Sequence, residues 1–208
     1  MIDRYLIIKN SKTNKSLVYY PVPKNGSTSA KMLLAKNLGI AAKFEYKDDI
    51  PKFKWKSEKN FDKPSISRLL PNKIRFSKII ADFKICIIRN PIDRFISAYE
   101  NRLLFHKDNA YKNISIDSVI DELQKGNFEN HFLPQSYFLG NNLRYFTNVY
   151  KINEMKLFEK KLNNFFSLKN KIQILQSKRN GRIKLLNNQI KKLEKVYKND
   201  FTLLEKYY

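Results

Sequence analysis

The alternation of apolar and polar positions predicts a small set of strands. Short β-rich runs at 5–9 and 17–22 are expected to form two strands, with SKTNKS as the turn between them. The continuous apolar run FKICII at 83–88 predicts a buried strand, because such runs are typical of strands covered on both faces. One more strand is expected near 144–152.

Helical spacing and capping residues predict the helices. One helix should follow the loop 23–29 and extend to about residue 38. Asn90 and Pro91 mark a sharp helix start, because Asn caps well and Pro suits the first helical position, and this helix should reach about residue 105. Further helices are expected at 115–125 with Ser115 as the cap, at 153–166, and over the last 30 residues. The segments 41–78 and 127–142 show no regular pattern.

The order strand, loop, helix occurs twice, at 17–38 and at 83–105. This alternation predicts one α/β domain over residues 1–208, a P-loop-like three-layer fold with a central parallel sheet flanked by helices. Ligands of such sheets lie beyond the carboxyl ends of the strands, where both loops are expected. The candidate chemistry should therefore be sought in these two loops.

The charge of the chain points to an anionic partner. The 208 residues include 41 Lys and Arg against 19 Asp and Glu, which leaves a formal charge of +22. Such an excess is compatible with nucleic acid, an acidic polysaccharide, a phosphate-rich cofactor or an anionic membrane surface, and it indicates nothing about the fold.

The cysteine content and the N-terminus favour a cytoplasmic protein. Cys86 is the one cysteine, so an internal disulfide is excluded, and its apolar surroundings predict a small buried residue rather than a metal ligand. MIDRYLIIKNSK lacks the features of a signal peptide, and no window has the roughly 18 apolar residues of a membrane span. Peripheral contact with the inner membrane face is kept as an alternative.

The first loop has the chemistry of an anion site. Gly26 lets the backbone approach a ligand, and Lys24 adds a mobile positive charge. Ser27, Thr28 and Ser29 supply hydroxyl and N–H groups at a helix N-terminus, where anions are favoured. The alternative is an ordinary helix start with Ser27 or Thr28 as the cap. The order GxxxxGK[ST] is absent, which disfavours a magnesium-dependent P-loop kinase or triphosphatase.

The second motif spans Arg89 to Tyr99. Arg89 closes the predicted strand and can bind a phosphate through two parallel hydrogen bonds. Ser97 lies two helical turns further on, and its side chain points back toward the N-terminus. The alternative is a well-capped helix whose Arg94 pairs with acidic neighbours.

Together the two motifs resemble a known family. YYPVPKNGSTSAK and KICIIRNPIDRFISAYENRL are similar to the two cofactor motifs of the sulfotransferases that use 3′-phosphoadenosine 5′-phosphosulfate (PAPS). The nearest branch modifies carbohydrates such as chondroitin, dermatan and heparan, and this chain resembles a bacterial-type member. HFLPQSYFLG and VYKNDFTLLEKYY extend the resemblance weakly toward the C-terminus.

The resemblance implies sulfuryl transfer from PAPS to a hydroxyl of a polysaccharide or glycolipid, with 3′-phosphoadenosine 5′-phosphate (PAP) as product and no metal. The 5′-phosphosulfate is expected on Lys24, Asn25, Gly26, Ser27, Thr28 and Ser29. Arg89 and Ser97 would hold the 3′-phosphate. Lys178 and Arg179 would belong to a basic loop that closes on this phosphate, although a charge run is also typical of plain surface.

The proton acceptor for the attacking hydroxyl is less well marked. His131 in the H-x-x-P-Q motif is the first candidate, because its ordinary pKa is near neutral, and Glu45 is the reserve. A structural role for His131 in an irregular loop is the alternative.

A non-enzymatic, polyanion-binding protein remains the competing reading. Aromatic residues alternate with lysines at Phe44, Tyr46, Phe53 and Trp55, and such rings can stack on the bases of a nucleic acid. No known nucleic-acid-binding motif accompanies them.

Overall fold

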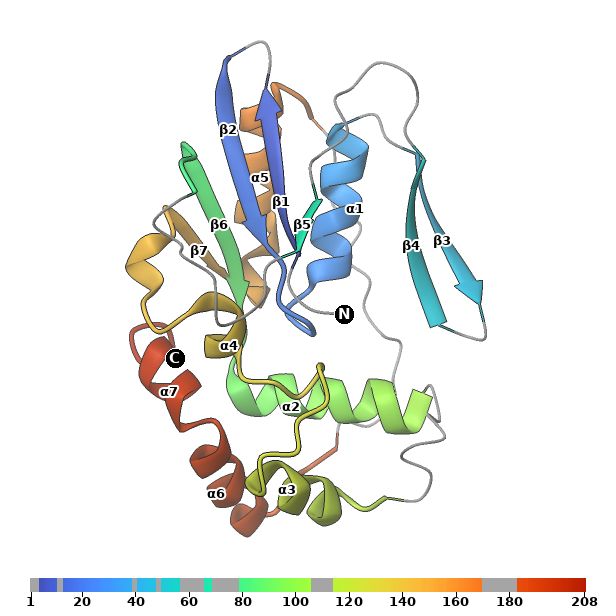
Figure 1. The fold of residues 1–208 in the computed structure, drawn as a ribbon, viewed down its shortest axis with the longest axis vertical. Coiled ribbons are helices and arrows are strands. Elements are labelled where there is room, and N and C mark those ends of the chain that lie inside the picture. The colour runs from blue at the N-terminus through green and yellow to red at the C-terminus, as the bar shows by residue number, and fades with distance from the viewer. Residues whose placement is uncertain are drawn as a thin grey trace. The chain divides into compact units, whose positions relative to one another are not determined.

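The computed structural model describes residues 4–10, 13–38, 41–47, 50–56, 66–68, 79–105, 114–169 and 183–208. These residues form two compact units (Figure 1). The sheet unit comprises residues 2–88 and 144–176, and the helical unit comprises residues 89–143 and 177–208 together with Met1.

In the described part of the chain, the sheet unit is built on five strands in the order β5-β1-β2-β6-β7 (Figure 1). Their bounds are Arg4–Asn10 for β1, Lys15–Tyr20 for β2, Ile66–Arg68 for β5, Phe83–Ile88 for β6 and Asn148–Lys151 for β7. Strands β2, β6 and β7 run parallel, as predicted, whereas β1 pairs antiparallel with both β2 and β5. The predicted α/β class, with helices flanking a central sheet, is confirmed.

Two helices cover one face of this sheet. They are α1 (Ser27–Asn37) and α5 (Met155–Phe166), which lie beside one another in Figure 1. Alternate strand residues pack against them, namely Leu17, Tyr19, Ile85 and Ile87. The residues between them are also buried: Val18, Tyr20, Cys86 and Ile88. Strand β6 is therefore covered on both faces at its carboxyl end, and burial raises the pKa of the Cys86 thiol.

The segment 41–78 contains more structure than its sequence suggests. Strands β3 (Ala41–Lys47) and β4 (Ile50–Lys56) form a separate two-stranded antiparallel sheet. Their register pairs apolar positions with one another, including Phe44 with Phe53 and Ala42 with Trp55. The alternation of aromatic residues and lysines is thus the period of two of a β-hairpin.

The helical unit has a core of helices α2 (Pro91–Tyr99), α3 (Ile116–Gln124) and α6 (Asn187–Val196). As predicted, Asn90 and Ser115 accept hydrogen bonds at the starts of α2 and α3 from the backbone N–H groups of Ile92 and Ser118. The apolar residues that meet there include Phe95, Ala98, Tyr99, Val119, Leu123 and Leu193.

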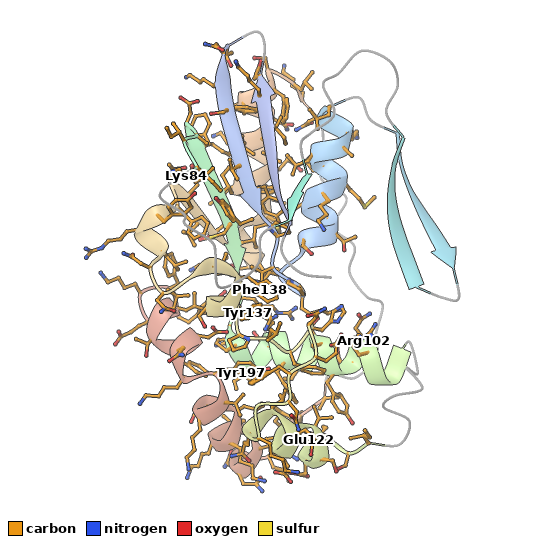
Figure 2. The ribbon with its side chains drawn as sticks, in the orientation of Figure 1. Lys84, Arg102, Glu122, Tyr137, Phe138 and Tyr197 are labelled. Atoms are coloured by element: carbon orange, nitrogen blue, oxygen red, sulfur yellow. The ribbon has the colours of Figure 1, made fainter. Side chains whose placement is uncertain are left out.

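The helix that starts at Pro91 reaches Phe105 as predicted, and its residues after Tyr99 form a π-helix, η3 (Glu100–Phe105). Two other predictions need correction. The segment 127–142 contains a short helix, α4 (Gln135–Leu139), on which Figure 2 labels Tyr137 and Phe138. The C-terminal region is not one helix, because it breaks at Tyr197 between α6 and α7 (Lys198–Leu204).

The remaining elements are two 3₁₀ turns on either side of β7. They are η5 (Leu143–Tyr145) and η6 (Ile152–Glu154). Among the helices of the described ranges, none combines the length and apolar character needed to cross a membrane.

Candidate functional site

The first loop leaves the sheet at the carboxyl end of β2. Tyr20, the last residue of β2, is in register with Cys86 of the parallel strand β6. The buried Asn25 side chain donates a hydrogen bond from Nδ2 to the Ile87 carbonyl oxygen at 2.7 Å. The loop is therefore fixed to the carboxyl end of β6, which is where ligands bind in parallel sheets.

Two residues of this loop have left-handed backbone conformations. Gly26 has φ +71°, which glycine adopts without steric penalty. Lys24 has φ +68°, a conformation that costs a residue with a Cβ about 1–2 kcal/mol. Such backbone strain clusters at functional sites, so its presence at the candidate lysine is consistent with the role predicted for it.

The N-terminus of α1 has no side-chain cap among the described residues. Gly26 is the N-cap residue, and the first turn contains no acidic residue. The alternative of Ser27 or Thr28 as an ordinary cap is therefore wrong. Uncapped N–H groups and the helix dipole leave partial positive charge at this end, which suits an anion.

The side chains around this helix start differ in accessibility. Ser27 is half-buried and Thr28 is exposed, whereas Ser29 is buried with 5% of its surface accessible. Lys24 is half-buried. Ser27 and Thr28 are thus the two hydroxyls of the loop that solvent reaches most readily.

Helix α2, in contrast to α1, has a side-chain cap at its N-terminus. Asn90 Oδ1 accepts hydrogen bonds from the N–H groups of Ile92 at 2.9 Å and of Asp93 at 3.3 Å. An anion at this motif would depend more on side chains than on these two N–H groups. Arg89 follows β6 directly and is half-buried. Ser97 is also half-buried, and it lies on the same face of α2 as the cap residue Asn90.

Gln135 clamps the backbone of Arg89. The N–H group of Arg89 donates to Gln135 Oε1 at 3.0 Å, and Gln135 Nε2 donates to the Arg89 carbonyl oxygen at 2.7 Å. Gln135 is fully buried. Its own backbone N–H and that of Ser136 each donate to the buried Asp200 carboxylate at 2.7 Å. The sequence predicted neither the contact of Gln135 with Arg89 nor that of Asp200 with the start of α4, although Gln135 belongs to the H-x-x-P-Q motif.

Two further buried side chains hold the residues just before Gln135. Arg94 donates to the Leu133 carbonyl oxygen at 2.7 Å, and the Tyr197 hydroxyl donates to the Phe132 carbonyl oxygen at 2.8 Å. Burial lowers the pKa of Arg94, and the negative charge of Asp200 partly offsets this effect. Arg94 is therefore a buried structural residue, and Asp200 is an acidic neighbour whose charge acts on it.

His131 is oriented by a carboxylate. Its Nδ1 lies 2.8 Å from Glu129 Oε1, and its backbone N–H donates to Glu129 Oε2 at 3.0 Å. Arg102, which Figure 2 labels on the π-helix η3, lies 3.9 Å from the same Oε1. Burial alone would raise the pKa of Glu129, but the hydrogen bonds from His131 and the charges of His131 and Arg102 bring that pKa below its ordinary value.

Several predicted site residues lie where the structure gives no side-chain geometry. Glu45 is on β3 in register with Lys52, but its side chain is outside the described part of the chain. Lys178 and Arg179 lie outside the described residues altogether. Their roles stay predictions. Within the ranges that are described, no cluster of three or more His, Cys, Asp or Glu side chains suited to a metal ion occurs.

Comparison with known proteins identifies the family. The model of the sulfotransferase family matches residues 10–208. Searches of curated proteins and of solved structures gave no significant match. The matched range contains both the loop after β2 and the motif after β6. The chain therefore belongs to the sulfotransferase family.

Proposed function

We propose that this sulfotransferase moves a sulfuryl group from PAPS to a hydroxyl of a carbohydrate, either a polysaccharide or a glycolipid. The observation that carries the proposal is the uncapped N-terminus of α1, which follows a strained lysine in a chain of this family. The carbohydrate acceptor rests on the resemblance of the two motifs to the carbohydrate-modifying branch.

The loop after β2 is assigned the 5′-phosphosulfate. The N–H groups at the start of α1, with the hydroxyls of Ser27 and Thr28, would bind its oxygens. Lys24 would face the oxygen between phosphorus and sulfur. As the bond from this oxygen to sulfur breaks, negative charge builds on the departing phosphate, and a fixed ammonium stabilises it more in the transition state than in the ground state.

Arg89 and Ser97 are assigned the 3′-phosphate. The guanidinium of Arg89 can donate two parallel hydrogen bonds to a phosphate, and the clamp from Gln135 fixes the backbone from which it extends. Lys178 and Arg179 would add positive charge to the same group. These contacts would distinguish PAPS from nucleotides that lack a 3′-phosphate.

The acceptor hydroxyl must lose a proton as it attacks sulfur. His131 is assigned this proton, with Glu45 as the reserve base. We further propose a cytoplasmic enzyme that meets an anionic or lipid-linked acceptor at the inner membrane face. The formal charge of +22 supports this, since clustered Lys and Arg attract anionic polymers and headgroups.

Calorimetric titration with PAP, and with ADP as the control ligand, tests the donor assignment. We expect the wild-type protein to prefer PAP by more than about tenfold, which is roughly 1.4 kcal/mol. Arg89→Ala should lose most of this preference, because only PAP carries the 3′-phosphate. The exposed Arg144 supplies the matched control, and Arg144→Ala should bind PAP normally.

Two results would count against the proposal. Equal affinity for PAP and ADP would remove the 3′-phosphate site, and normal PAP affinity in a folded Arg89→Ala variant would remove Arg89 from it. Binding to a random oligonucleotide that exceeds binding to PAP and heparin, and that weakens steeply with salt, would favour the polyanion-binding alternative.

A further inference from the structure

Glu129 uses both of its carboxylate oxygens on His131. Oε1 faces Nδ1 at 2.8 Å, while Oε2 accepts the backbone N–H at 3.0 Å and lies 3.1 Å from Nδ1. An ionised carboxylate only accepts hydrogen bonds, so Nδ1 must carry the hydrogen. Within the described ranges no residue hydrogen-bonds to Nε2, and 31% of the side chain is accessible.

The position of Glu129 is itself defined by its neighbours. Its side chain is only 24% accessible, and the guanidinium of Arg102 lies 3.9 Å from Oε1. Arg102 is placed by the π-helix η3, and short π segments within helices occur frequently at functional sites. Within the helical unit, the Arg102 guanidinium thus faces the Glu129 carboxylate, and this carboxylate faces the imidazole of His131.

We propose that Glu129 is a positioning residue that holds His131 in the tautomer with hydrogen on Nδ1, which leaves Nε2 as the proton acceptor of the reaction. This inference rests on the proposed sulfuryl transfer. Neutral imidazole in water favours the opposite tautomer, with hydrogen on Nε2. That form cannot accept a proton at Nε2, so an enzyme that uses this atom as a base needs a partner that fixes Nδ1–H.

The acceptor hydroxyl oxygen forms a bond to sulfur, and its proton passes to Nε2 of His131. The bond from sulfur to the bridging oxygen breaks, and PAP leaves with that electron pair. The imidazolium that results lies against the Glu129 carboxylate, whose charge stabilises it. A sulfate ester and PAP are the products, and release of the proton from His131 restores the base.

The variant Glu129→Gln nearly keeps the shape of the side chain but changes the hydrogen bonds that it can make with His131. The single carbonyl oxygen of glutamine can accept the backbone N–H of His131, as Oε2 does now. The NH₂ group then takes the place of Oε1 and faces Nδ1. NH₂ only donates and would make the shorter contact with Nδ1, at 2.8 Å against 3.1 Å for the glutamine oxygen, so Nδ1 is favoured as an acceptor and the hydrogen of the ring moves to Nε2. This nearly isosteric change should therefore reverse the tautomer.

Nitrogen-15 NMR of histidine-labelled protein reads the tautomer directly. The chain has two histidines, His106 and His131, so a His106→Gln background leaves one imidazole to observe. We expect hydrogen on Nδ1 at neutral pH, retention of this form in Glu129→Asp, and hydrogen on Nε2 in Glu129→Gln. Hydrogen on Nε2 in the parent protein would overturn the inference, whether or not the protein binds PAPS.

Kinetics provide the second readout. The assay measures the transfer of radioactive sulfate from PAPS to unsulfated chondroitin and to heparosan. Where neither polysaccharide is an acceptor, the rate of PAPS hydrolysis is measured instead. Glu129→Gln should lower kcat by about 10²–10⁴-fold with little change in KM, because the loss affects proton transfer rather than binding. The exposed Glu122 gives the control, and Glu122→Gln should behave as wild type.

The two failures remain distinguishable. Normal kcat in Glu129→Gln with a reversed tautomer would show that His131 is not the base, and would overturn the catalytic part of the inference. A wild-type protein that neither binds PAP nor consumes PAPS would overturn the proposed function, and the parent tautomer would still decide whether Glu129 orients His131.

Discussion

Lys24→Gly is expected to remove most of the sulfuryl transfer while leaving the fold at least as stable as the wild type. The ammonium of Lys24 is assigned to the departing phosphate, and loss of one preorganised donor to a developing anion typically lowers kcat by about 10²–10³-fold. The measurement is the rate of sulfate transfer from radioactive PAPS at saturating donor.

The expected stability of Lys24→Gly follows from the backbone conformation at this position. Lys24 has φ +68°, so a side chain at this position keeps the chain in a disfavoured region that glycine occupies freely. Urea unfolding should therefore find Lys24→Gly more stable than Lys24→Ala by about 1 kcal/mol, because alanine retains the steric penalty and glycine loses it. Both variants lack the ammonium, so both should lose sulfuryl transfer to the same extent.

Lys36 supplies the matched control for the loss of positive charge. It is an exposed lysine in the last turn of α1, at the opposite end of this helix from the loop that contains Lys24. Lys36→Ala should retain wild-type transfer. Near-normal kcat in Lys24→Gly would rule out the catalytic role of this lysine, and equal stability of the glycine and alanine variants would mean that the strain at Lys24 is relieved in solution.

The parts of the fold that were predictable are those whose signals are local. The run at 83–88 forms β6 with the predicted bounds, and Asn90, Pro91 and Ser115 start their helices because capping involves residues only two or three positions apart. The loop 23–29 was recognisable for the same reason, since its glycine, lysine and hydroxyl residues are consecutive.

The hairpin at 41–56 shows how a local signal can mislead. Proline usually breaks regular structure, yet Pro51 lies at the second position of β4. Among the described residues, strands β3 and β4 form a sheet of two in which each strand has one partner, and proline is tolerated near the start of an edge strand. The alternation of aromatic residues and lysines is the stronger signal for a strand, although the same alternation is compatible with a surface that stacks on nucleic-acid bases.

The supporting residues of the site were not predictable from the sequence. Gln135 contacts Arg89 across 46 positions, and Asp200 contacts Gln135 across 65. These hydrogen bonds depend on the packing of helices far apart in the chain, which a single sequence does not encode as a pattern. Glu129 and His131 are only two positions apart, but spacing alone does not reveal that the carboxylate turns toward the ring.

The buried Asp200 should prove to be a major contributor to the stability of the helical unit. We expect Asp200→Ala to lower the free energy of unfolding by about 3–5 kcal/mol, as measured by urea denaturation. The substitution removes the acceptor of the buried N–H group of Gln135 and of the partly buried N–H group of Ser136, and a buried N–H group left without an acceptor costs about 1–3 kcal/mol. It also removes the negative charge that offsets the burial of the Arg94 guanidinium.

Asp121 provides the control, because its carboxylate pairs with Lys192 at 2.8 Å but is half exposed to solvent. Asp121→Ala should lower the free energy of unfolding by less than about 1 kcal/mol, as exposed ion pairs contribute little. A loss this small in Asp200→Ala would contradict the role assigned to Asp200. The milder variant Asp200→Asn keeps one acceptor oxygen, and where it folds it should bind PAP more weakly than wild type. Asp200 holds the start of α4, and Gln135 on α4 fixes the backbone of Arg89. Arg89 is the proposed ligand of the 3′-phosphate, so a disturbed α4 should weaken this contact.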